Sequence, residues 1–150
     1  MLRKLVPLFV GLAFLFSVAL AEENYTLSGE VTFRKDGDIY ICLLNMEGYR
    51  DFQNPRNELS QLKCQVIKMN ADLKEAKKVS FKFDNVPKGT YCIVALQDVN
   101  NNGKADFENY VISEPWGSYR SLEIGSVHGN TWDNVKFDLE KDITGIKIQM

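Results

Sequence analysis

The sequence of 150 residues contains a single histidine and lacks the short motifs that most directly indicate a function. Neither a G-x-G-x-x-G pattern nor a P-loop is present, so no phosphate-binding loop is predicted. The 18 basic residues are outnumbered by 20 acidic ones, which gives a net charge of −2 and excludes the basic face of a nucleic-acid-binding protein. We therefore expect no nucleic-acid partner.

Catalytic side chains are also scarce. The one imidazole, His128, lies in the short polar stretch Ser126–Asn130, and no nucleophile-elbow motif accompanies it. A Ser–His–Asp site would have to be assembled entirely by the fold, and a lone histidine in a loop is usually a solvated side chain. The sequence predicts a protein that is not an enzyme.

One long apolar run is present, and it stands at the N-terminus. Arg3 and Lys4 precede an almost wholly apolar stretch over residues 5–20, which ends in the small-x-small triplet Ala19–Ala21. This order is typical of a secretory signal peptide, whereas the alternative, a membrane anchor, needs about 20 apolar residues. We expect residues 1–21 to be a signal peptide. Residues 22–150 would then form one domain, exported to the periplasm or the medium, without membrane contact after cleavage.

Three cysteines, Cys42, Cys64 and Cys92, remain in the exported part. In an oxidising compartment two of them can form a disulfide, and three pairings are possible. The alternative is three buried thiols that pack as small hydrophobic side chains. Because the spacing matches no zinc or redox motif, the sequence leaves the pairing open.

Alternation of apolar and polar residues with a period of two dominates the exported part and predicts β-strands. The alternation is clearest over Leu27–Phe33 and Val79–Phe83. Ile39–Leu44 and Tyr91–Leu96 are apolar on both faces, as expected for strands that are covered on two sides. Further strands are expected over residues 64–69, 107–112, 135–139 and 143–148.

Two stretches lack this pattern. Residues 45–62 are rich in polar side chains, with Pro55 in the middle, and predict a long loop or a variable insertion. Residues 70–78 contain helix-forming residues but are too short for a helix that is stable alone. Seven or eight short strands separated by turns predict an all-β fold, an antiparallel β-sandwich.

The densest polar cluster directly follows the apolar strand that ends near Gln97. It reads DVNNNGKAD, with an oxygen-bearing side chain at every second position and a glycine where the chain must turn. A calcium loop offers side-chain oxygens at positions one, three, five and nine and a backbone carbonyl at position seven. The sequence thus predicts a Ca²⁺ site made by the side chains of Asp98, Asn100, Asn102 and Asp106 and the carbonyl of Lys104.

The loop departs from a complete EF-hand in two ways. Position twelve, a bidentate acid in an EF-hand, is Asn109, and the loop follows a strand rather than a helix. Glu114 is the natural candidate to complete the ligand set. With two or three carboxylates, the dissociation constant for Ca²⁺ would be about 10⁻⁴–10⁻³ M. The alternative is a rigid turn without an ion, because Asp and Asn side chains also cap their own backbone.

The stretch from the strand at Gly89 to Ser118 resembles the bacterial exported family catalogued as domain of unknown function 2141. The family pattern runs from a G-x-Y strand into H-D-x-N-x-N-G-K-x-D and then into G-x-P-x-E-x-x-G. The segment Trp132–Leu139 is similar to the aromatic-x-x-x-x-F-x-L ending of the family. The matching positions are Pro87, Gly89, Tyr91, Asp98, Asn100, Asn102, Gly103, Lys104, Asp106, Glu114 and Gly117.

This resemblance covers most of the exported chain, from about Leu27 to the end. It implies export and a transthyretin-like or regulatory-domain-like β-sandwich, and it brings no established activity. The sequence departs from the family pattern at three positions: Gln97 stands in place of His, Tyr110 in place of Gly and Ile112 in place of Pro. A function that depended on that His would be lost here.

Aromatic residues after the loop offer a second interpretation. Flat rings on the rim of a β-sandwich can stack on sugars or on partner side chains, with Trp116 and Tyr119 as the candidates and Trp116 as the most exposed ring. Alternatively, the rings close one end of the core. We therefore expect an exported, non-enzymatic module that binds Ca²⁺, or else a carbohydrate- or protein-recognition domain with an envelope protein or a glycan as partner. The aromatic set is Phe107, Tyr110, Trp116, Tyr119 and Trp132.

Overall fold

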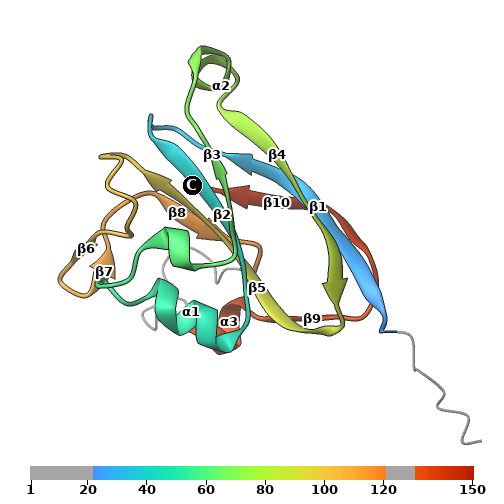
Figure 1. Cartoon of the computed structure of the whole chain (residues 1–150). Coiled ribbons are helices and arrows are strands. Elements are labelled where there is room, and N and C mark those ends of the chain that lie inside the picture. Colours follow the sequence, from blue (N-terminus) through green and yellow to red (C-terminus); the bar gives the residue numbers. More distant parts are fainter. Residues whose placement is uncertain (1–21, 121–130) are drawn as a thin grey trace, which may run out of the picture.

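The computed structural model describes residues 22–120 and 131–150, whose regular structure is mostly β (Figure 1). The expected signal peptide and His128 lie outside these residues. In the described part, no helix is long and apolar enough to cross a membrane. The strands are β1 (Asn24–Thr32), β2 (Asp38–Leu44), β3 (Cys64–Ile67), β4 (Lys78–Pro87), β5 (Gly89–Asp98), β6 (Phe107–Glu108), β7 (Val111–Ile112), β8 (Trp116–Ser118), β9 (Phe137–Leu139) and β10 (Ile143–Gln149). The helices are α1 (Met46–Phe52), the 3-10 helix η1 (Leu59–Gln61), α2 (Ala71–Ala76) and α3 (Trp132–Val135).

The strands form two larger sheets and one hairpin. The smaller sheet has the order β10-β1-β4, and the larger has the order β3-β2-β5-β8, with β9 paired to the start of β5. β6 and β7 form a separate hairpin. Two details differ from the sequence prediction. β1 and β10 pair in parallel, and the described residues contain ten strand segments, some too short for a periodic pattern to reveal.

β2 and β5 lie side by side in the larger sheet and are buried on both faces, as their continuous apolar sequences predict. On one face, Ile39 and Ile41 of β2 and Ile93 of β5 belong to a core cluster that also contains Leu27 and Val31 of β1. This cluster joins the two sheets. Since burial of each such side chain contributes about 1.5–3 kcal/mol, it is the main source of stability on this side.

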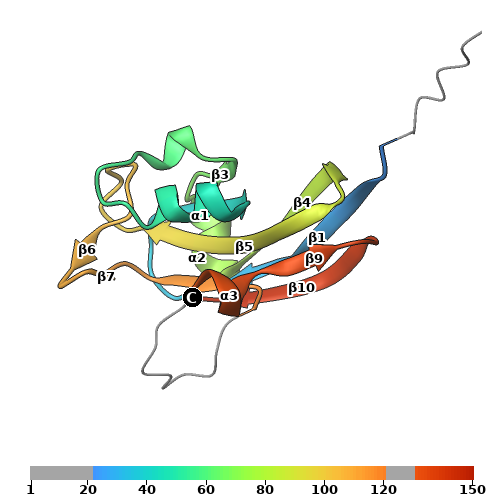
Figure 2. The ribbon, with the colours of Figure 1, turned by 90° about the horizontal axis from the view of Figure 1, so that it is seen from below.

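The other face of the larger sheet is partly covered by α1 (Figure 2). Cys42 and Val94 of the sheet share a second core cluster with Tyr49 and Phe52 of α1. The prediction of a long loop over residues 45–62 is therefore wrong at its start. A helix forms there because Asn45 caps it, its Oδ1 accepting the N–H of Gly48 at 2.9 Å, and because Tyr49 and Phe52, three residues apart, face the sheet.

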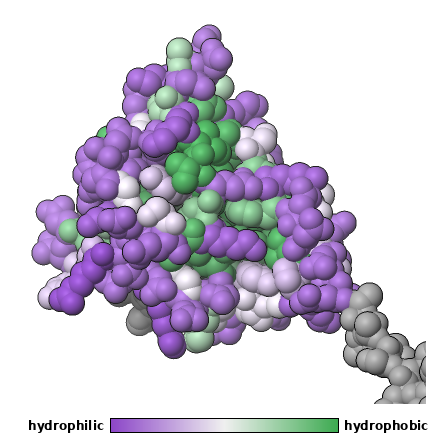
Figure 3. All heavy atoms as spheres, in the orientation of Figure 1, coloured by the Kyte–Doolittle hydropathy of each residue, from purple (hydrophilic) through white to green (hydrophobic). Residues whose placement is uncertain are grey.

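The stretch 70–78 contains α2, which stands at one end of the molecule between β3 and β4 (Figure 1). Asn70 caps it, since its Oδ1 accepts the N–H of Leu73 at 2.9 Å. Figure 3, in the orientation of Figure 1, shows a mostly hydrophilic surface with an apolar patch below α2. Met69 and Leu73 pack, partly buried, against the core between the sheets. Tertiary packing thus supports a helix that would be too short to form alone.

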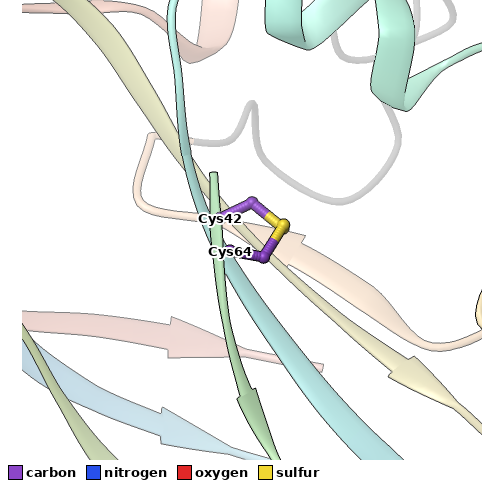
Figure 4. Close-up of a disulfide and its surroundings, with 2 residues drawn as sticks. All are labelled: Cys42 and Cys64. Atoms are coloured by element: carbon purple, nitrogen blue, oxygen red, sulfur yellow. A yellow bond between two sulfur atoms is a disulfide. The ribbon is translucent and has the colours of Figure 1, made fainter. Parts of the chain in front are cut away.

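A disulfide joins Cys42 of β2 to Cys64 of β3, which are directly opposite each other in the sheet (Figure 4). This settles the pairing that the sequence left open. The bridge spans a sequence separation of 22 residues, and closure of such a loop stabilises the folded state by about 3 kcal/mol in the chain-entropy model. Cys92 of β5 is free and buried, and burial raises the pKa of its thiol to about 12.

Thiol labelling should separate the three cysteines. Because only the thiolate reacts, we expect iodoacetamide at pH 8 to leave the native protein unmodified. After unfolding in urea without reductant, mass spectrometry should show one added group, on Cys92, and after reduction three. Three groups without reductant would contradict the Cys42–Cys64 bridge, and labelling of the native protein would contradict the burial of Cys92.

Candidate functional site

The loop that follows β5 begins with a buried carboxylate. The side chain of Asp98 is 1% exposed, and its two oxygens accept the N–H groups of Asn102 (3.0 Å) and Gly103 (2.8 Å). Gly103 has a φ of 76°, in the left-handed region that favours glycine. The turn predicted from the Asp, Asn and Gly run is therefore present, and Asp98 fixes its start.

Asp106, at the end of the loop, binds the side chains of two asparagines. Asn100 Nδ2 donates to Asp106 Oδ2 (2.6 Å), and Asn102 Nδ2 donates to Asp106 Oδ1 (2.9 Å). The amide oxygens of the same asparagines accept backbone N–H groups, those of Asn102 (3.1 Å) and Lys104 (2.9 Å). The loop is thus closed by hydrogen bonds among its own side chains and backbone.

Glu114 joins the two ends of the loop. Its Oε1 accepts the N–H of Val99 (2.9 Å), and its Oε2 accepts the N–H of Asp106 (3.2 Å). The residue is 8% exposed. Burial raises the pKa of its carboxyl group, and the nearby charges of Asp106 and Asp98 act in the same direction, whereas the two N–H donors oppose them. Glu114 therefore closes the loop through backbone hydrogen bonds, and its role as a calcium ligand stays a prediction.

The structure brings all the predicted calcium ligands into one loop with Glu114 at its base. However, Asn100 and Asn102 present nitrogen to Asp106, and only an amide oxygen can bind Ca²⁺. Within residues 22–120 and 131–150, no group of three or more His, Cys, Asp or Glu side chains could hold a metal ion. A cation beside Asp106 would require both amide groups to rotate. Lys104 takes part in this loop through its N–H, which donates to Asn102.

The same loop positions the β6–β7 hairpin. The N–H of Ser113, the residue after β7, donates to the carbonyl of Asp106, the residue before β6, at 2.8 Å. The N–H of Leu59, in η1, donates to the carbonyl of Gly103 at 2.9 Å. The hairpin and the segment after α1 are therefore both anchored to the loop.

Gln97, the residue before the loop, lies apart from it. Successive side chains of a strand point to opposite faces, so Gln97 and Asp98 do not share a face of β5. The Gln97 side chain is fully buried, its Nε2 donates to the carbonyl of Lys35, and its Oε1 has no hydrogen-bond partner in the described residues. It therefore links β5 to the turn between β1 and β2.

A groove of about 1130 Å³ lies between α1, the β6–β7 hairpin, β8 and the start of α3, elements that lie on the same side of the molecule (Figures 1 and 2). Aliphatic side chains from α1 and the hairpin share its lining with aromatic ones. Five aromatic residues line it: Tyr49, Phe107, Tyr110, Trp116 and Trp132.

Ring contacts hold the base of this groove together. The rings of Tyr49 and Trp132 have centroids 5.9 Å apart, and those of Phe52 and Trp116 are 6.1 Å apart. Burial raises the pKa of Tyr49 to about 12. These contacts join α1 to β8 and α3, and they fix the positions of the two tryptophans.

Two exposed residues stand at the edges of the groove. Tyr110, in the two-residue turn of the β6–β7 hairpin, is 100% exposed and has a φ of 66°. Arg50, in the last turn of α1, is the charged residue of the lining. The expectation that Trp116 is the most exposed ring is wrong, because Trp116, on β8 of the larger sheet, is half-buried against Phe52 of α1.

The sequence identified some of these groove residues and missed others. Trp116 lines the groove, whereas Tyr119 packs edge-to-face on Phe137, 5.3 Å between centroids, in the core between the sheets. The sequence pattern does not reveal the groove residues of α1, among them Tyr49 and Arg50, because residues 45–62 lack a strand or helix period. The available signal is the capping residue Asn45, followed by apolar side chains at intervals of three residues, Met46, Tyr49 and Phe52.

The raised pKa of Glu114 makes stability depend on pH in a defined direction. A carboxyl group with a higher pKa in the folded state stabilises the fold at low pH, and this contribution is lost as the pH rises through the folded-state pKa. We expect the free energy of unfolding to fall relative to that of Glu114→Gln as the pH rises from about 4, the ordinary pKa of a glutamate. Urea unfolding at a series of pH values measures this. The exposed Glu108→Gln is the matched control, and parallel curves for the native protein and Glu114→Gln would contradict the shift.

The loop and the groove both lie in the part of the chain that matches a known protein family. A family model described as an uncharacterized protein conserved in bacteria (DUF2141) matches residues 31–147, which include both features. The comparisons with curated proteins and with solved structures found no match. The family match confirms the resemblance inferred from the loop sequence and covers well over half of the chain. The chain therefore belongs to this bacterial family, DUF2141.

Proposed function

We propose that this chain is an exported, non-enzymatic binding module that takes its ligand in the aromatic groove. The observation that carries the proposal is a groove of about 1130 Å³ with five aromatic side chains in its lining. Ligand sites are typically concave, mostly apolar and equipped with a few polar groups. The groove has this composition, and Arg50 supplies its charge.

The distribution of exposed apolar side chains supports this choice of site. Among the described residues, five large hydrophobic residues are exposed, and three of them line this groove. Apolar side chains gathered at one concave place on a soluble protein commonly mark an interaction site, whereas scattered ones need no explanation. The three are Met46 (45% exposed), Tyr110 (100%) and Val111 (64%).

The proposal also includes the scaffold and the compartment. The core cluster shared by the β10-β1-β4 sheet and the larger sheet supports a β-sandwich of the transthyretin-like kind, with the groove outside it, beside α1. The Cys42–Cys64 disulfide supports export, because disulfides persist in oxidising compartments. In such a compartment, an envelope protein or a glycan would be the partner.

A second candidate function is Ca²⁺ binding by the loop after β5. Asp98 and Asp106 lie in the loop, and Glu114 lies at its base. In the described residues, none of these three carboxylates forms an ion pair with Lys or Arg. A bound cation would neutralise charges that the loop side chains cannot neutralise for one another. Asp98, Asn100, Asn102, Asp106 and Glu114, together with the Lys104 carbonyl, are the proposed ligands.

The groove can be tested with anilinonaphthalene sulfonate (ANS), an aromatic anion that fluoresces in apolar surroundings. Both tryptophans of the chain line the groove, so bound ANS should quench their emission by energy transfer, and the quenching should saturate. Val111→Asp places a negative charge in the lining at an exposed position. We expect it to weaken ANS binding about tenfold, equal to roughly 1.4 kcal/mol.

The matched control is Val66→Asp, which makes the same change on β3, outside the groove, at a residue that is 45% exposed. ANS should bind this variant as it binds the native protein. Equal weakening by the two substitutions, or ANS binding without quenching of tryptophan emission, would place the ANS site elsewhere and contradict the proposal.

Calcium binding is tested by thermal unfolding. With a dissociation constant near 10⁻³ M, 10 mM Ca²⁺ should stabilise the fold by about 1 kcal/mol and raise Tm by a few degrees relative to a chelator. Asp98→Ala and the less disruptive Asp106→Asn should abolish the rise. MgCl₂ at the same ionic strength is the control for screening. Identical melts of the native protein with Ca²⁺ and with chelator would remove the calcium proposal.

A further inference from the structure

We infer that the ligand of the groove is an extended segment of another protein in which an acidic side chain stands between apolar ones. The inference rests on the proposed function, because it assumes that the groove is the binding site. Three features support it: a cation without an ion pair in the described residues, a lining with few amide and aliphatic hydroxyl side chains, and a hairpin with outward-facing backbone groups.

Arg50 supplies a charge that a ligand can complement. It is exposed and has no ion pair in the described residues. The neighbouring Asp51 instead accepts a hydrogen bond from Asn57 Nδ2 at 3.2 Å. A guanidinium group offers paired N–H donors that match the two oxygens of a carboxylate. Among the described residues, the lining of the groove includes Arg50 and no Asp or Glu.

The lining favours a peptide over a sugar. Each buried hydroxyl of a sugar needs a hydrogen-bond partner, and the groove offers few. Besides Arg50 and the polar atoms of the Tyr and Trp rings, the described polar lining residues are Gln53, Asn109 and Thr131, and Gln53 Nε2 already donates to the hydroxyl of Tyr49 at 3.0 Å. Apolar side chains of a peptide would instead be buried against the aliphatic wall, formed by Met46, Pro55, Val111 and Ile112.

The hairpin offers backbone partners for an extended chain. Because the N–H of Ser113 donates to the carbonyl of Asp106, Phe107 and Ile112 form a non-hydrogen-bonded pair. Their N–H and C=O groups therefore point away from the hairpin, and within the described residues β6 and β7 pair only with each other. A peptide lying along either strand can form main-chain hydrogen bonds, as in β-strand addition.

Tyr110 supplies a further indication of a ligand. It shares the turn of the hairpin with Asn109, and both have positive φ, 66° and 50°. A glycine fits this turn without strain, whereas a bulky residue in the left-handed region is strained. The ring of Tyr110 is fully exposed, so packing within the fold does not compensate for the strain. Contact with a bound segment at the edge of the groove gives the ring a role.

The test is a selection from random twelve-residue peptides displayed on phage, with the purified, oxidised protein as target. We expect the enriched sequences to share an Asp or Glu flanked by aliphatic or aromatic residues. A synthetic copy should quench the emission of Trp116 and Trp132. Replacing its acid by the corresponding amide should weaken binding about tenfold.

Charge reversal separates a direct contact from an indirect effect. Arg50→Glu should weaken binding of the acidic peptide at least tenfold, and a peptide with Lys in place of the acid should bind this variant better than it binds the native protein. Arg34→Glu, the same change at an exposed residue between β1 and β2, should have no effect. Tyr110→Gly should raise Tm and still weaken binding, whereas a purely structural tyrosine would lower Tm.

Three outcomes would overturn the inference: no enriched peptide, enrichment of basic or wholly polar peptides, or acidic-peptide binding that survives Arg50→Glu. Binding of polygalacturonate, an acidic polysaccharide, with dependence on Arg50 and without peptide binding would replace the peptide by a saccharide. Each of these outcomes leaves the ANS titration of the groove unchanged. Failure of the ligand class is therefore distinguishable from failure of the groove as a binding site.

Discussion

The pairing of β2 with β5 is the constraint on which the rest of the structure depends. Both strands are apolar on both faces, so each face must be covered for the pair to leave water. The sheet β10-β1-β4 covers one face, and α1 covers part of the other. One short helix cannot cover the whole face, and the β6–β7 hairpin, anchored by the Asp98–Asp106 loop, stands across from it. The groove is the space left between them.

Much of this fold could be predicted from local sequence. The strands β1, β2, β4 and β5 show either alternation or a continuous apolar run, and both signals are contained within the strand itself. α1 is different, because its seven residues include Gly48 and bury only Tyr49 and Phe52, which is too little for a helical period. The parallel pairing of β1 with β10 joins the two ends of the described chain, and no local pattern encodes such a pairing.

The loop and the groove also differ in how far apart their residues lie in the sequence. The turn of the loop is predictable from local sequence, because Asp98, Asn102 and Asp106 lie within a few positions and form their contacts with one another. The walls of the groove come from α1, the hairpin and α3, which meet only in the tertiary structure. Composition does not predict that the side chain of Tyr119 points into the core between the sheets. Nor does it predict the exposed ring of Tyr110, which lies in a turn that suits glycine. The first depends on which face of the sheet each side chain takes, and the second is a departure from backbone preference.

The disulfide between Cys42 and Cys64 has a consequence for the groove as well as for stability. The two cysteines enclose α1 and η1 in one covalent ring, so the helical wall of the groove is tied to the sheet at both of its ends. Reduction opens that ring and leaves α1 held by noncovalent packing, chiefly through Tyr49 and Phe52. A newly made chain in a reducing compartment would therefore have a looser groove than the oxidised protein.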